Sequence, residues 1–217
     1  MKIGYDYWQD KKIACLGDSI TAGAGNNGYG WVEFLKEIFP QADVRKHGVS
    51  GSTVAVCDRR KEAPFVERMK EISPDYDLCI VFGGINDFIN SVPLGEKGSD
   101  DIETFYGALE YLLRYLLEQN PKGEIMLLTP MRVNGFKEYP YWTEQNQDGH
   151  TLRDYRDALL EIAEYYAIPV LDLFSMSNIN AETAEMRSCT LPDGLHPSAE
   201  GHKRIARKTA QFIASFL

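Results

Sequence analysis

The chain has 217 residues, of which 44% are hydrophobic and 25% are charged, as in ordinary soluble globular proteins. A chain of this length can bury a large core without a metal ion or a disulfide, so we expect a single domain over residues 1–217. The formal net charge of −9 argues against nucleic acid and anionic membranes as partners, because both would repel the protein.

Apolar runs of strand length alternate with segments of helical periodicity along the whole chain. We expect strands at residues 12–16, 42–47, 78–82, 124–128 and 169–173. We expect helices at residues 29–39, 65–72, 102–119, 152–166 and 198–216. Strands that alternate with helices in this way form a parallel sheet with helices on both faces. The sequence therefore predicts the α/β class, with a five-stranded, mostly parallel sheet.

Cysteine and histidine spacing gives no sign of a metal site. The four cysteines form no Cys-x-x-Cys pair, and we expect all four to be structural. Three histidines (His47, His150 and His202) lack partners at motif spacing, and we expect His202 on the exposed side of the last helix. We therefore expect no metal ion and no cofactor.

The N-terminal segment gives no targeting signal. The first twelve residues contain no apolar core of a signal peptide, and no run reaches the roughly 20 apolar residues that a spanning helix needs. We expect a cytoplasmic protein without membrane insertion.

Small and polar residues follow the predicted strands at four places. The segments are Gly-Asp-Ser-Ile-Thr at 17–21, Gly-Val-Ser-Gly-Ser-Thr at 48–53, Gly-Gly-Ile-Asn-Asp at 83–87 and Asp-Gly-Leu-His-Pro at 193–197. Ligands of doubly wound sheets bind beyond the carboxyl ends of the strands. We therefore expect these four segments to gather in one site.

The residue types in these segments suit acyl transfer from an ester. A serine nucleophile (Ser19) needs a histidine base (His196), and the histidine needs a carboxylate (Asp193) that fixes its tautomer. The developing oxyanion needs donors, which the Ser19 and Gly51 N–H groups and the Asn86 amide can supply. Taken alone, a serine such as Ser19 is more often a helix cap than a nucleophile. The presence of the other groups favours catalysis.

In this order the four segments resemble the four blocks of the SGNH hydrolases, the GDSL esterase and lipase family. The resemblance extends from about residue 12 to residue 205 and implies a flavodoxin-like three-layer α/β/α fold. It implies Ser19 as nucleophile, His196 as base with Asp193 as its orienting acid, and Ser19, Gly51 and Asn86 as the oxyanion hole. The chain departs from the family at Lys46, where an asparagine often stands.

The substrate is predicted from the long loop at 131–149, which carries Arg132 and several aromatic residues. We expect Arg132, Tyr141 and Trp142 to contact substrate, with Arg132 binding a carboxylate or phosphate. The aromatic residues suit a sugar or a short acyl chain, and they equally suit the interface of a homo-oligomer.

We therefore predict a serine esterase that forms an acyl-enzyme and hydrolyses short acyl esters of small molecules or carbohydrates, acetyl esters first. A lysophospholipase or acyl thioesterase of the same family is the alternative. A flavin- or nucleotide-binding flavodoxin-like protein ranks third, because the glycine-rich first loop matches neither Gly-x-Gly-x-x-Gly nor a P-loop.

Overall fold

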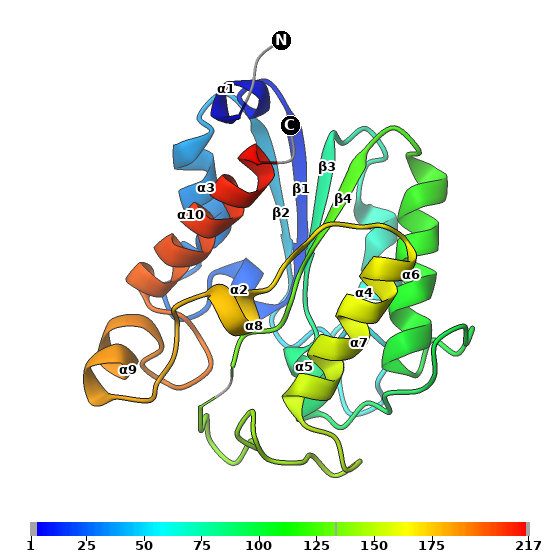
Figure 1. Cartoon of the computed structure of the whole chain (residues 1–217), viewed down its shortest axis with the longest axis vertical. Helices are drawn as coiled ribbons and strands as arrows, with labels where there is room; N and C mark the ends of the chain where they lie inside the picture. Colours follow the sequence, from blue (N-terminus) through cyan, green and yellow to red (C-terminus); the bar gives the residue numbers. More distant parts are fainter. Residues whose placement is uncertain (1–3, 133, 216–217) are drawn as a thin grey trace.

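A five-stranded, all-parallel sheet forms the centre of the computed structural model, which describes residues 4–132 and 134–215 (Figure 1). The strands are β1 (Lys12–Gly17), β2 (Asp43–Gly48), β3 (Leu78–Phe82), β4 (Glu124–Leu128) and β5 (Val170–Leu171). Their spatial order is β2-β1-β3-β4-β5. The predicted α/β class and parallel sheet are confirmed, and the order is the flavodoxin-like one.

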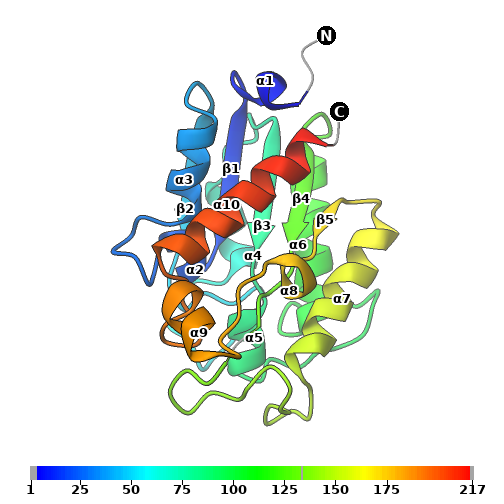
Figure 2. The ribbon, with the colours of Figure 1, turned by 60° about the vertical axis from the view of Figure 1, so that its left-hand side comes forward.

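Helices cover both faces of this sheet. One face carries α3 (Trp31–Ile38) and α10 (Ala199–Ala214), which pack against each other (Figures 1 and 2). The other face carries α4 (Phe65–Arg68), α6 (Phe105–Gln119) and α7 (Leu152–Tyr165), with the 3₁₀ turn η1 (Met69–Glu71) after α4. The three layers follow from strands that are apolar on both sides and therefore need helices above and below.

The predicted longer helices are all present, and their ends shift by a few residues. Gly30 and Thr104 cap α3 and α6, so these helices begin later than the predicted ranges. Five short helices were not predicted: α1 (Tyr5–Trp8), α2 (Ser19–Ala22), α5 (Ile85–Ile89), α8 (Leu173–Met176) and α9 (Ala184–Thr190). A helix shorter than about two turns shows no periodicity that a sequence pattern can detect.

The fifth strand is shorter than the predicted 169–173. Only Val170–Leu171 pairs with β4, and α8 begins at Leu173. The side chain of Asp172, between them, accepts hydrogen bonds from Thr129 and Arg156. These bonds hold the residue where the strand turns into the helix.

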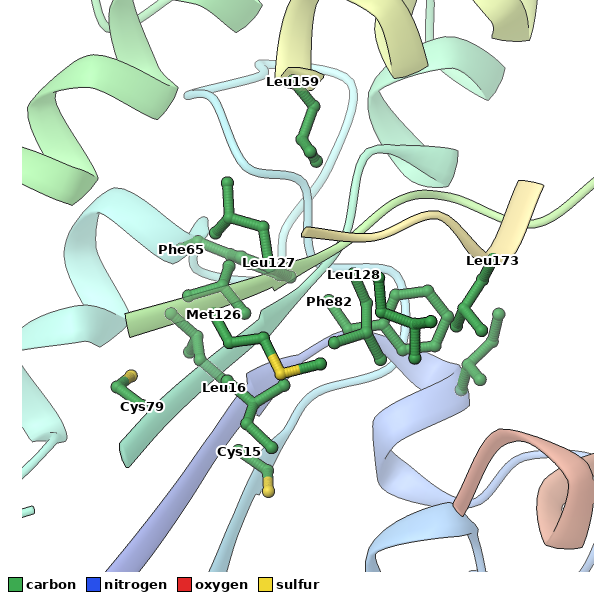
Figure 3. Close-up of a cluster of buried hydrophobic side chains, with 14 of the residues drawn as sticks. Cys15, Leu16, Phe65, Cys79, Phe82, Met126, Leu127, Leu128, Leu159 and Leu173 are labelled. Atoms are coloured by element: carbon green, nitrogen blue, oxygen red, sulfur yellow. The ribbon is translucent and has the colours of Figure 1, made fainter. Parts of the chain in front are cut away.

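The core lies between the strands and the helices on each side (Figure 3). Cys15 and Cys79 are completely buried in β1 and β3, and burial raises the pKa of both thiols, that of Cys79 to about 12. They pack as small apolar side chains, as the sequence predicts. In the described ranges, no helix combines the length and the apolar composition that crossing a membrane requires.

Candidate active site

The loops after β1, β2 and β3 meet at the carboxyl end of the sheet, where the strand order changes direction. This is the lower end in Figure 1, beside α2 and α5. The crevice at such a switch point is the usual ligand site of an open α/β sheet.

Ser19 is the first residue of α2, directly after β1. The Asp18 carboxylate caps this helix, because its Oδ1 accepts a hydrogen bond of 2.9 Å from the Ile20 N–H. Asp18 thus orders the turn. Ser19 itself is 8% exposed and faces a cavity. The turn therefore delivers the hydroxyl to the end of the sheet.

Ser19, His196 and Asp193 form a continuous chain of contacts. His196 Nε2 lies 3.2 Å from Ser19 Oγ, and His196 Nδ1 lies 2.8 Å from Asp193 Oδ2. Asp193 Oδ1 also accepts the backbone N–H groups of Leu195, at 2.9 Å, and His196, at 2.7 Å. The arrangement is that of a nucleophile, a base and an orienting carboxylate.

The electrostatics favour an ionised Asp193. Burial raises the pKa of this carboxyl, but the hydrogen bonds from the His196 ring and from the Leu195 and His196 N–H groups outweigh burial and lower it below its usual value. An ionised carboxylate keeps the proton on Nδ1 and leaves Nε2 free to accept one from Ser19.

Three donors converge on the same cavity. The Ser19 and Gly51 N–H groups form no hydrogen bond with another described residue. Gly51 has a φ of 86°, in the left-handed region that favours glycine. Asn86, on α5, donates from Nδ2 to the Ser52 carbonyl at 3.0 Å. Its second contact, to Asp18 Oδ2, is 3.4 Å long, so that hydrogen is only weakly held.

Asp87, next to Asn86, fixes the loop that carries Gly51. Its carboxylate is fully buried and accepts the N–H groups of Val54, at 2.9 and 3.0 Å, and Ala55, at 3.0 Å. Burial raises the pKa of Asp87 to about 7 and that of Asp18 to about 6. Asp87 is 0% exposed and has a role in holding two loops together.

Arg68, which no sequence pattern singles out, lies beneath the site. It is 3% exposed, and its guanidinium donates to the Gly17 carbonyl at 3.1 Å, to Ser52 Oγ at 3.0 Å and to the His47 carbonyl. It therefore ties the ends of β1 and β2 to the loop that carries Gly51 and Ser52.

Lys46, where the chain departs from the family pattern, contacts the segment that follows α2, the helix that begins at Ser19. Its ammonium donates to the Gly28 carbonyl at 2.9 Å and pairs with Glu33 at 2.7 Å. The lysine thus anchors the segment that follows α2.

The cavity in front of Ser19 measures about 290 Å³. It is lined by Ser19, Ala24, Ser50, Gly51, Arg60, Glu62, Asn86, Phe136, Lys137, Tyr139, Leu195 and His196. The 131–149 loop contributes Phe136, Lys137 and Tyr139, and the Phe136 ring packs edge-on against His196 with a centroid distance of 5.2 Å. The sequence did not single out Arg60, Glu62 or Lys137.

The three residues expected to contact substrate lie outside this lining. The Arg132 guanidinium lies 4.7 Å from the centroid of the Trp142 ring and 5.2 Å from that of Phe174. Tyr141, from the same loop, is 45% exposed. Any contact of these side chains with substrate would involve a part of the substrate that extends beyond the cavity.

The expected exposure of His202 is wrong. The side chain is completely buried, and its Nε2 lies 2.8 Å from the Ala24 carbonyl. Its face of α10 covers the segment after α2, which lies far away in the sequence, so the helical pattern alone could not reveal this contact. Burial lowers the pKa of His202. Across the residues with described positions, no group of three or more metal-ligating side chains is found.

Comparison with known proteins agrees with this geometry. The GDSL-like Lipase/Acylhydrolase family matches residues 15–204, which include all four segments. The chain belongs to this family. It is therefore a carboxylic ester hydrolase, as the sequence predicts.

Individual relatives span nearly the whole of this hydrolase. A GDSL esterase/lipase of Arabidopsis thaliana, CPRD49, is 24% identical over 207 residues, which are 93% of this chain and 78% of the relative. A solved structure from Lactobacillus plantarum is 30% identical with a TM-score of 0.86, and covers 95% of this chain and 98% of its own. A possible lipase from Chitinophaga pinensis, at 23% identity, 95% and 98% coverage and a TM-score of 0.74, shares the fold.

Proposed function

We propose that this hydrolase cleaves short-chain acyl esters through an acyl-enzyme on Ser19, and that acetyl esters are its preferred substrates. The observation that carries the proposal is the contact chain from Ser19 Oγ through His196 to Asp193, at 3.2 and 2.8 Å. Such a chain activates a serine hydroxyl that is otherwise a weak nucleophile.

In the acylation step, Ser19 Oγ attacks the ester carbonyl carbon while His196 Nε2 takes the hydroxyl proton. Asp193 stabilises the imidazolium that forms. The tetrahedral intermediate collapses, and His196 gives the proton to the departing alcohol. Water, activated by the same histidine, then attacks the acyl-enzyme and releases the acid.

The oxyanion of each tetrahedral intermediate is bound by the Ser19 and Gly51 N–H groups and by the Asn86 amide. Each such donor is worth roughly 2.7–4 kcal/mol of transition-state stabilisation. The Asn86 amide hydrogen that points to Asp18 is weakly held, so it can donate to the oxyanion instead. The bond from Asn86 to the Ser52 carbonyl keeps the amide in place as it does so.

The size of the cavity supports a small acyl group. At about 290 Å³ it lies at the lower end of the range for small-molecule pockets, roughly 300–1,000 Å³. Phe136 and Tyr139 offer flat apolar surface beside His196, which suits a sugar ring in the alcohol part. Arg132, Tyr141 and Trp142 would then contact only a larger alcohol.

The test is hydrolysis of p-nitrophenyl esters from acetate to dodecanoate, together with acetylated sugars. We expect kcat/KM to be highest for acetate and to fall with chain length. Ser19→Ala should remove activity by orders of magnitude while the unfolding transition stays in place. A maximum at octanoate or longer would favour a lysophospholipase. An S19A variant with near wild-type activity would overturn the mechanism.

A further inference from the structure

The cavity in front of Ser19 carries two cations that have no anionic partner. Arg60 and Lys137 both line it, and neither forms an ion pair with any described residue. The chain as a whole has a formal net charge of −9. The unpaired cations beside Ser19 are therefore opposite in sign to the net charge of the protein. Positive charge that lines a cleft attracts anionic ligands.

Arg60 lies beside one of the oxyanion donors. Its Nη1 is 3.3 Å from the point where a Cβ atom on Gly51 would stand. Its Nε is buried and has no hydrogen-bond partner among the described residues. Because Nε is closed off from the cavity, the guanidinium can meet an anion there through its Nη groups, whose hydrogen bonds to an anionic oxygen are charge-assisted.

Lys137 lies on the histidine side of the cavity. Its ammonium is 5.0 Å from the centroid of the Phe136 ring, and that ring packs against His196. The backbone of Lys137 has a φ of 54°, which a residue with a side chain rarely adopts. The Lys137 ammonium and the His196 ring therefore both pack against the Phe136 ring.

Glu62 is the carboxylate that opposes this charge. Its Oε2 lies 3.2 Å from the same Cβ point on Gly51, yet it forms no ion pair with Arg60. Two further carboxylates, Asp193 and Asp18, lie beside His196 and Ser19 and accept backbone N–H groups there. Among the described residues, no carboxylate is in ion-pair contact with Arg60 or Lys137, so both cations are free to bind an anion in the cavity.

We propose that Arg60 and Lys137 form an anion subsite, and that the natural ester carries a carboxylate or phosphate group that this subsite binds. This inference rests on the proposed esterase function and specifies its substrate class. The anion can belong to the alcohol part or to the acyl part, since Lys137 lies near the base that protonates the alcohol and Arg60 lies near the oxyanion donors.

The test compares matched pairs of esters that differ in one anionic group. 4-Acetoxybenzoate against its methyl ester, and 4-acetoxyphenyl phosphate against 4-acetoxyanisole, place a carboxylate or a phosphate on the alcohol part. Phenyl hydrogen succinate against phenyl butyrate, corrected for spontaneous hydrolysis, places it on the acyl part. The quantity measured is the ratio of kcat/KM for the charged ester to that for the neutral ester.

We expect this ratio to exceed one for at least one pair, and to fall about tenfold or more in R60Q and in K137Q, as loss of a charge-assisted hydrogen bond implies. It should rise in E62Q and decline in the wild type as salt is added. The matched control is K61Q, because Lys61 is exposed, adjacent to Arg60 and absent from the cavity lining. Circular dichroism checks that each variant is folded.

The inference is overturned if the wild type hydrolyses the neutral esters but favours none of the charged ones. It is also overturned if R60Q and K137Q keep the wild-type ratio. Failure of the esterase proposal is a different result, namely no Ser19-dependent hydrolysis of the neutral esters. The exposed position of Lys137 lets K137Q decide the question even where R60Q folds poorly.

Discussion

Replacing Arg68 by methionine tests how the oxyanion donors are held in place. The substitution keeps an unbranched stem and removes the guanidinium with its charge and its donors. The Gly17 carbonyl, the His47 carbonyl and Ser52 Oγ then each lose a hydrogen bond to a buried guanidinium. Bonds to charged groups contribute roughly 1.5–3 kcal/mol each, but the arginine also pays a desolvation cost that the methionine avoids.

We therefore expect R68M to lower the free energy of unfolding by about 3 kcal/mol, less than the sum of three such bonds. For a chain of this size, that corresponds to a decrease of roughly 6–12 °C in Tm. Urea unfolding followed by tryptophan fluorescence measures the change. K70M is the matched control, because Lys70 lies two residues away and is exposed.

The kinetic effect should fall on kcat. Ser52 accepts from Arg68 through its hydroxyl and from the Asn86 amide through its carbonyl, so a displaced Ser52 displaces an oxyanion donor. We expect kcat for p-nitrophenyl acetate to fall roughly 10–100-fold, part of the value of one donor, while KM changes little. R68K should retain a higher kcat than R68M, since lysine keeps the positive charge but lacks the planar set of N–H donors of a guanidinium.

Two results would refute this reasoning. An R68M enzyme that is destabilised but keeps wild-type kcat would show that Arg68 supports the fold without positioning the donors. An R68M enzyme with an unchanged unfolding midpoint would show that its three hydrogen bonds contribute no net stability.

Three further predictions follow from the site. D193N should lower kcat for p-nitrophenyl acetate by about 10⁴-fold, because the amide favours the wrong histidine tautomer, and a loss below tenfold would contradict the role of Asp193. N86A should lower kcat roughly 10²–10³-fold with a small change in KM, and an unchanged kcat would remove Asn86 from the oxyanion hole. Burial raises the pKa of Asp87 to about 7, so the folded state binds more protons than the unfolded state between about pH 4 and 7. The free energy of unfolding of the wild type relative to D87N, measured in urea across this range, should therefore fall as the pH rises, and a flat or rising difference would show that the carboxyl is ionised throughout.

The parts of the fold that could be predicted have a local cause. β3 and β4 are continuous apolar runs, and their bounds match the expected residues because strands buried on both faces show that pattern. Ser19, Gly51, Asn86 and the 193–197 segment could be assigned to one edge because each follows a strand or precedes the last helix.

The parts that could not be predicted depend on contacts between distant segments. Arg68 lies in an amphipathic helix, where an arginine normally faces solvent, and its acceptors are 16, 21 and 51 residues away. His202 was misplaced for the same reason, since its partner at Ala24 is 178 residues away. Arg60 and Lys137 come from loops whose course no periodicity describes.

The catalytic chain joins the beginning of the sequence to its end, because Ser19 and His196 are separated by 177 residues. With Ser19 and His196 as the proposed nucleophile and base, a nascent chain would not hydrolyse an ester until the segment around His196 has left the ribosome and docked beside β1. In a refolding experiment, recovered esterase activity would report the closure of a contact with a large loop entropy, while secondary structure forms earlier. Esterase activity can therefore serve as a measure of complete folding.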